Sequence, residues 1–155
     1  MKTLILYASK YGATAEIAKR VAAQLENATI YDLKQGNIPR LEDYDCIIVG
    51  SSVYAGSFRK EAKTFIAQNA FDLATKKPGL FVCSIGESND EVFKKNVPDN
   101  VLQAAKAKAA LGGAFDPKKA NFFERLIMKA ATKQSGRVDN ISDERIIRFA
   151  EEMKT

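Results

Sequence analysis

The sequence predicts an α/β protein built on a doubly wound, five-stranded parallel sheet of strand order 2-1-3-4-5, with helices on both faces, in three layers. Three observations support this prediction. Short apolar runs alternate with helical segments along the chain, most of these runs are continuous rather than alternating in polarity, and glycine- and hydroxyl-rich loops follow the first and third runs. Continuous apolar runs are typical of strands buried on both faces.

The expected strands are short and spaced by segments long enough to hold a helix. A chain of 155 residues with 46% hydrophobic content suits one domain, 1–155, with a full core. Pro78 and Gly79 mark the entry to the fourth strand. The strands are expected at Leu4–Tyr7, Ile30–Leu33, Cys46–Val49, Leu80–Ser84 and Ala109–Phe115.

Helical periodicity fills the intervals between the strands. Ile17, Val21 and Leu25 recur on one face of the first helix. A capping box that starts at Ser88 begins the third helix, and Ser142 caps the last one. The helices are expected at Ala13–Leu25, Arg59–Gln68, Asn89–Asn96, Val101–Lys106, Asn121–Lys133 and Asp143–Met153.

The loop between the first strand and the first helix has the composition of an anion site. Ser9 and Thr14 supply hydroxyl groups, Gly12 allows close backbone approach, and main-chain N–H groups lie near the start of a helix. A phosphate is the expected ligand, and an ordinary strand-to-helix turn is the alternative. The residues assigned to this loop are Ser9, Lys10, Tyr11, Gly12, Ala13 and Thr14.

Two further loops are expected at the same edge of the sheet. Tyr54 lies among small residues after the third strand and suits stacking on a flat heterocycle, although a surface or packing tyrosine is the alternative. Gly86 permits backbone contact with a ligand edge, while Glu87 is alternatively a first-turn helix charge. The residues assigned to these loops are Ser52, Val53, Tyr54, Ala55, Gly56, Ser84, Ile85, Gly86 and Glu87.

The absence of histidine from the sequence restricts the chemistry that side chains can supply. It removes histidine metal sites and serine- or cysteine-histidine catalysis, so we expect no metal and assign no catalytic side chain. Cys46 and Cys83 lie in apolar stretches and are expected to be buried thiols, with a redox disulfide as the alternative. A bound cofactor is therefore expected to supply any chemistry.

The formal net charge of +5 favours anionic partners. Nucleic acid is not expected, because no zinc-finger spacing, RNA-binding aromatic pair or recognition helix is found. Segment 116–137 is expected to form an extra helical element before the last helix. Its basic and apolar residues suit contact of 118–137 with an anionic membrane or a site for a carboxylated substrate. Packing on the sheet with a solvated basic face is the alternative.

The expected location is the cytoplasm, with peripheral contact at the inner face of the membrane as a further expectation. Only Met1–Thr3 precede the first expected strand, which leaves no room for a signal peptide. No apolar run approaches the roughly 18 residues that a membrane span needs. The oligomeric state is left open.

Together the three loops resemble those of the flavodoxin superfamily. The loop Ser9–Thr14 resembles its FMN-phosphate motif, and Gly50–Gly56 resembles its flavin-stacking loop, with Tyr54 as the aromatic residue. The resemblance covers the whole chain in order and length. It implies a five-stranded sheet and FMN as the cofactor.

A narrower resemblance concerns the flavodoxin-like branch that contains the menaquinone-dependent protoporphyrinogen dehydrogenases. Ala8–Gly12, Gly50–Gly56 and Phe123–Lys129 are similar to that branch, which also has an extra segment before the last helix. This resemblance implies oxidation of a porphyrinogen with electrons passed to quinone. The alternatives are a diffusible electron carrier between redox proteins and an FMN-binding module with a regulatory role.

The chain departs from flavodoxin electron carriers in two respects. Such carriers are typically acidic and usually have a second aromatic residue after the fourth strand, whereas this chain is basic and Ser84–Asp90 holds no aromatic residue. Positive charge favours an anionic reduced flavin. We therefore expect a less negative flavin potential than in an acidic carrier.

Overall fold

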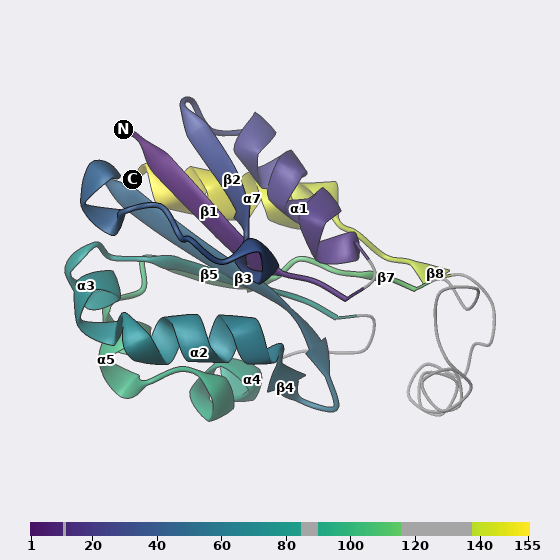
Figure 1. Cartoon of the computed structure of the whole chain (residues 1–155). Helices are drawn as coiled ribbons and strands as arrows, with labels where there is room; N and C mark the ends of the chain where they lie inside the picture. Colours follow the sequence, from purple (N-terminus) through teal and green to yellow (C-terminus); the bar gives the residue numbers. More distant parts are fainter. Residues whose placement is uncertain (11, 85–89, 116–137) are drawn as a thin grey trace.

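The computed structural model describes residues 1–10, 12–84, 90–115 and 138–155 (Figure 1). Its central strands are β1 (Thr3–Ala8), β2 (Ala28–Asp32), β3 (Cys46–Tyr54), β4 (Ser57–Phe58), β5 (Gly79–Cys83) and β6 (Ala107–Ala110). Five of them form a parallel sheet in the order β2-β1-β3-β5-β6, and β4 pairs antiparallel with β3. Without the short β4, this is the predicted 2-1-3-4-5 order.

Helices cover both faces of this sheet (Figure 1). Helices α1 and α7 pack together on one face, while α2, α3, α4 and α5 lie on the other. None of the helices in the described part of the chain is long and apolar enough to span a bilayer. The helices are α1 (Ala13–Ala23), α2 (Lys60–Gln68), α3 (Ala70–Thr75), α4 (Asp90–Asn96), α5 (Asp99–Ala104) and α7 (Asp143–Lys154), with short 3-10 turns η1 (Leu33–Gln35) and η2 (Leu41–Asp43).

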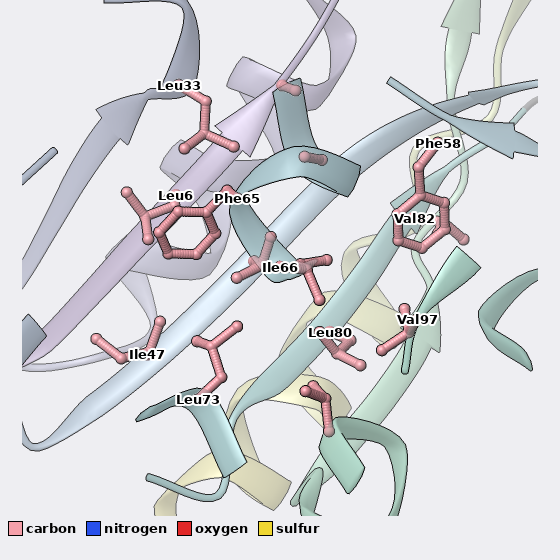
Figure 2. Packing of buried hydrophobic residues seen from close by; sticks show 14 of the residues in the cluster. Leu6, Leu33, Ile47, Phe58, Phe65, Ile66, Leu73, Leu80, Val82 and Val97 are labelled. Carbon is pink, nitrogen blue, oxygen red and sulfur yellow. The ribbon is translucent and has the colours of Figure 1, made fainter. Parts of the chain in front are cut away.

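The strands divide the core between the two faces because successive side chains point to opposite sides. Leu4 and Leu6 of β1 face the α2 side, and Ile5 faces the α1 and α7 side. Figure 2 shows the α2 side, where Phe65 and Ile66 pack among side chains of several strands. Burial on both faces explains why the strand sequences are continuous apolar runs.

The last predicted strand, Ala109–Phe115, is wrong as a single element. The structure breaks it into β6, which ends at Ala110, and β7 (Ala114–Phe115), which pairs antiparallel with β8 (Val138–Asp139). Gly112 lies between them with a φ of 89°, a left-handed conformation that interrupts an extended strand. A Cβ at Gly112 would lie 2.0 Å from the carbonyl oxygen of Asn140, so the break is also tightly packed.

The third predicted strand is too short. It was expected to end at Val49 and to continue as a loop to Gly56, whereas β3 runs on to Tyr54. The extension exists because Val53 and Tyr54 pair with the two residues of β4. Helix α3 was not expected, and the predicted helix Asn121–Lys133 lies outside the described residues.

Other predicted ends differ by a few residues. Helix α1 ends at Ala23 rather than Leu25, although Leu25 is buried on the same face as Ile17 and Val21. Ser142 caps α7 as predicted, since its Oγ accepts a hydrogen bond from the N–H of Arg145 at 3.2 Å. The capping box at Ser88 lies outside the described residues.

Candidate functional site

The loops that follow β1, β3 and β5 leave the sheet at one edge. The strand register places Ala8 beside Ser51, Ser51 beside Val82, and Ser52 beside Cys83. In an open parallel sheet, ligands bind in the crevice at the carboxyl ends of the strands where the strand order reverses. The structure therefore brings the predicted loops together at this edge, apart from Tyr11 and residues 85–89, which lie outside the described residues.

The first loop forms a tight entry to α1. The N–H of Gly12 donates to the Oγ of Ser9 at 3.0 Å, and Gly12 adopts a φ of 93° as the N-cap residue. The first helical hydrogen bond runs from the N–H of Glu16 to the carbonyl of Gly12 at 3.1 Å. Helix α1 has no side-chain cap. The N-terminus of this helix therefore has the unsatisfied N–H groups and the partial positive charge that bind anions.

Thr14 shows that this loop fits a phosphate. The residue is fully buried, and among the described residues no group hydrogen-bonds to its Oγ1. An unpaired buried hydroxyl costs about 1–3 kcal/mol. A phosphate oxygen bound at the loop would accept the hydrogen bond that Thr14 does not make within the chain.

The second loop is a β-hairpin rather than an open loop. Ala55 and Gly56 form its turn, and both have positive φ, 51° and 77°. Two positive φ values define the type I′ turn that matches the twist of paired strands. Tyr54 directly precedes the turn and exposes 39% of its surface, so its ring is available to a ligand.

Two side chains to which the sequence analysis assigned no role hold this hairpin. The Oγ of Ser51 accepts from the N–H of Arg59 at 2.9 Å and donates to the carbonyl of Ser52 at 2.9 Å. The side-chain amide of Asn96, at the end of α4, bonds to Gly56 and Phe58. Nothing in the local sequence distinguishes Asn96, because its partners lie about 40 residues earlier in the chain.

The third loop is described only at its first residue. The N–H of Ser84 donates to the carbonyl of Gly112 at 3.0 Å, which ties the root of this loop to the turn between β6 and β7. Ser84 is half-buried and Lys10 of the first loop is exposed. Ile85, Gly86 and Glu87 lie outside the described residues.

Burial shifts the pKa of two titratable groups on the central strands, in both cases toward the protonated form. Burial raises the pKa of the Tyr7 phenol, and the Asp32 carboxylate raises it further. Burial also raises the pKa of the Cys46 thiol. Both cysteines are buried, as predicted. In the described part of the chain, no cluster of histidine, cysteine and carboxylate side chains is suited to hold a metal ion.

An α/β sheet of this order, with a glycine turn into a helix after β1 and a hairpin with an exposed tyrosine after β3, is the arrangement of flavodoxin-like proteins. A family model described as "Flavodoxin domain" matches residues 4–142. The chain belongs to this family.

Curated relatives and solved structures agree with this membership. The chain is 25% identical over 150 residues to protoporphyrinogen IX dehydrogenase [quinone] of Escherichia coli K12, covering 88% of this chain and 81% of that one. It is 23% identical over 147 residues to the Leishmania major protein of the same name, covering 87% and 64%. Flavodoxin 2 from Bacillus cereus has the same fold, with a TM-score of 0.63 at 20% identity, covering 99% and 98%.

FMN is the cofactor of this family, and the chain is an FMN-binding redox protein. The buried hydroxyl of Thr14 and the left-handed Gly12 at the start of α1 fit the phosphate of this cofactor. The flavin supplies the redox chemistry, which agrees with the lack of histidine in the sequence.

Proposed function

We propose that this protein is an FMN-dependent oxidoreductase that oxidises a porphyrinogen and passes the electrons to a quinone. The observation that carries the proposal is the alignment of 88% of the chain with a relative named protoporphyrinogen IX dehydrogenase [quinone]. This relative, 25% identical to the chain, supports the proposed type of reaction.

The residues proposed to hold FMN are those that the sequence assigns to the three loops. Ser9 and Thr14 would bind the phosphate through their hydroxyl groups. Gly12 would hold the turn in the shape that lets the phosphate approach the backbone of the same loop, including Lys10, Tyr11 and Ala13. The ring of Tyr54 would stack on the flavin and exclude water from one face of it. The backbone of 52–56 and of 84–87 would contact the flavin edge.

FMN accepts and releases electrons singly or in pairs, so it can connect a two-electron donor with a quinone. Each pair of electrons and protons removed from the porphyrinogen would reduce one quinone to a quinol. No described side chain of the site is assigned as a general base. The raised pKa of Tyr7, near the carboxyl end of β1, keeps its phenol protonated at neutral pH.

The charge of the chain supports an anionic substrate. The net charge of +5 attracts molecules with carboxylate groups and disfavours cationic ones. The same charge favours the anionic reduced flavin, so the proposal includes a less negative flavin potential than in an acidic carrier. A redox titration that finds a strongly low potential for the second electron would contradict this part.

The test is an anaerobic assay of the FMN-loaded protein with protoporphyrinogen IX and a soluble quinone. Porphyrin fluorescence should rise only when protein, FMN and quinone are all present. Thr3→Val, a change at the opposite end of β1 from the site, is a control that should keep full activity. No rise in fluorescence above the rate without protein would exclude the proposed activity.

The second candidate function is a flavodoxin-type carrier that exchanges electrons with other redox proteins. It is favoured by the near-complete overlap with flavodoxins of similar length, such as the Bacillus cereus protein. Rapid electron exchange with a redox protein, without porphyrinogen oxidation, would support this candidate instead.

We also propose peripheral membrane contact through segment 118–137. This rests on the basic and apolar residues of the segment, which lies outside the described residues. Contact with the membrane would place the protein where membrane quinones are found. Liposome co-sedimentation at low salt checks it, and equal recovery with anionic and neutral vesicles would exclude electrostatic binding.

A further inference from the structure

Strand β4 has two edges, and only the inner edge pairs with β3. At the outer edge lies the side-chain amide of Asn96. Its Nδ2 donates to the carbonyl of Gly56 at 2.9 Å, and its Oδ1 accepts from the N–H of Phe58 at 3.2 Å. The carbonyl of one residue and the N–H of the second residue after it are the two groups that a neighbouring strand would pair with. The amide of Asn96 therefore completes this edge as a peptide group would.

Asn96 itself is held rigidly by α4. It is only 9% exposed, and its Nδ2 also donates to the carbonyl of Val92 at 2.7 Å. These contacts determine the orientation of the amide, because the reverse orientation would place its oxygen against two carbonyl groups. The rings of Phe93 and Phe58 add an edge-to-face contact with centroids 6.2 Å apart.

The hairpin needs this support. A two-residue strand is marginal by itself, and Ala55 adopts a positive φ that side chains other than glycine disfavour. Ser51 binds the backbone of Arg59 on the β3 side, and Asn96 binds the outer side. Figure 1 shows α4 beside β4, at the same end of the sheet as the first loop.

We infer that Asn96 is a positioning residue for the flavin: by fixing the β3–β4 hairpin onto α4, it sets where the ring of Tyr54 meets FMN. This inference rests on the proposed stacking role of Tyr54. It does not depend on which substrate is oxidised. Failure of the porphyrinogen assay would therefore leave it standing.

The experiment measures FMN affinity by titration of the apoprotein in four forms: wild type, Asn96→Leu, Tyr54→Ala and the double variant. Asn96→Leu removes the amide with little change in volume and should weaken FMN binding about tenfold. In the Tyr54→Ala background the same change should cost less than about twofold, because the hairpin then has no ring to position.

Asn69→Leu is the matched control. The Nδ2 of Asn69 donates to the carbonyl of Phe65 at 2.9 Å, four residues earlier, as Asn96 does to Val92. This asparagine follows α2 rather than α4, and its amide bonds to the end of α2 instead of to the hairpin. Its replacement should therefore leave FMN affinity within about twofold of the wild type, since only the shared helix contact is lost.

Two results would overturn the inference. One is unchanged FMN affinity in Asn96→Leu, and the other is an equal loss in the presence and absence of Tyr54. A normal affinity in Tyr54→Ala would separately contradict the stacking role. If Asn96→Leu does not fold, Asn96→Asp replaces it, since this variant keeps the acceptor for Phe58 but sets a carboxylate oxygen against Gly56. Wild-type affinity in Asn96→Asp would likewise overturn the inference.

Discussion

The hydroxyl oxygen of Ser9 accepts a hydrogen bond from the N–H of Gly12 at 3.0 Å, across the turn that leads into α1. This bond uses a lone pair of Ser9 and leaves its O–H free to donate. It also removes the N–H of Gly12 from the groups available to an anion. The sequence alone does not distinguish the hydrogen-bond donors of this loop. In the structure they differ, because the N–H of Gly12 is already bonded, whereas the hydroxyl of Thr14 has no partner among the described residues.

The first prediction concerns Thr14→Val. A charge-assisted hydrogen bond to phosphate is worth roughly 1.5–3 kcal/mol, so FMN affinity should fall about ten- to a hundredfold. The apoprotein should keep or gain stability, because valine has a similar volume to threonine but lacks the buried, unpaired hydroxyl. Isothermal titration with FMN and urea unfolding of the apoprotein measure the two effects.

Thr3→Val provides the control for this prediction, since Thr3 is equally buried at the opposite end of β1. It should leave FMN affinity unchanged. If Thr14→Val binds FMN as tightly as the wild type, the hydroxyl does not contact the phosphate.

The second prediction concerns Gly12→Ala. The φ of 93° is unfavourable for alanine by about 1–2 kcal/mol, while no described atom beyond the adjacent residues lies within 4 Å of the added Cβ. The loop should relax away from this conformation, lowering FMN affinity at least about tenfold. Measurements of FMN affinity and of the free energy of unfolding are needed together.

Gly36→Ala is the control that distinguishes a general loss of stability, caused by backbone strain, from a specific loss of FMN binding. Gly36 lies after η1 and also has a positive φ, 65°, and no atom of the described chain beyond its two neighbours lies within 4 Å of an added Cβ. This variant should lose stability to a similar or greater extent but retain FMN affinity. An equal loss of affinity in both variants would attribute the effect to general destabilisation.

The layer order of the fold could be predicted because burial on both faces makes a strand a continuous apolar run. The ends of the elements could not, because they depend on distant partners. Strand β3 extends to Tyr54 only because β4 pairs with it, and β6 stops where Gly112 packs against Asn140. Neither of these contacts can be predicted from the local sequence.

The candidate site also has one part that local sequence predicts and one part that depends on distant residues. The first loop is local, so its residue types and spacing predict it. The hairpin depends on Asn96, whose amide reaches back to Gly56 and Phe58. An asparagine at the end of a helix is ordinary in sequence, and only the packing of α4 beside β4 reveals its role.

The third prediction concerns Gly50→Ala in the centre of β3. A Cβ at Gly50 would lie 2.0 Å from Cζ of Phe81, whose ring is fully buried. Overpacking of this kind costs typically about 1–3 kcal/mol or more, so unfolding should occur at lower urea concentration. Phe81→Leu in the same chain should recover part of the loss, because the smaller side chain makes room.

Urea unfolding of the two single variants and the double variant measures this coupling. The free energies of the single changes should not add, since the two residues are in contact. If Gly50→Ala were as stable as the wild type, the ring of Phe81 would not pack against the backbone at this position.

The last prediction concerns the thiol of Cys46. Burial raises its pKa above the ordinary value of 9.0, so the thiolate that reacts with alkylating agents is scarce at pH 8. A group whose pKa is raised by folding stabilises the native state at low pH, and this stabilisation is lost as the pH rises past 9.0. Iodoacetamide should therefore label Cys46 slowly in the native protein and quickly in urea.

The free energy of unfolding should fall above about pH 9, and less steeply in Cys46→Ala, because that variant lacks the titrating thiol. Fast native labelling at pH 8, or an identical alkaline slope in Cys46→Ala, would show that the thiol is not shielded by the sheet.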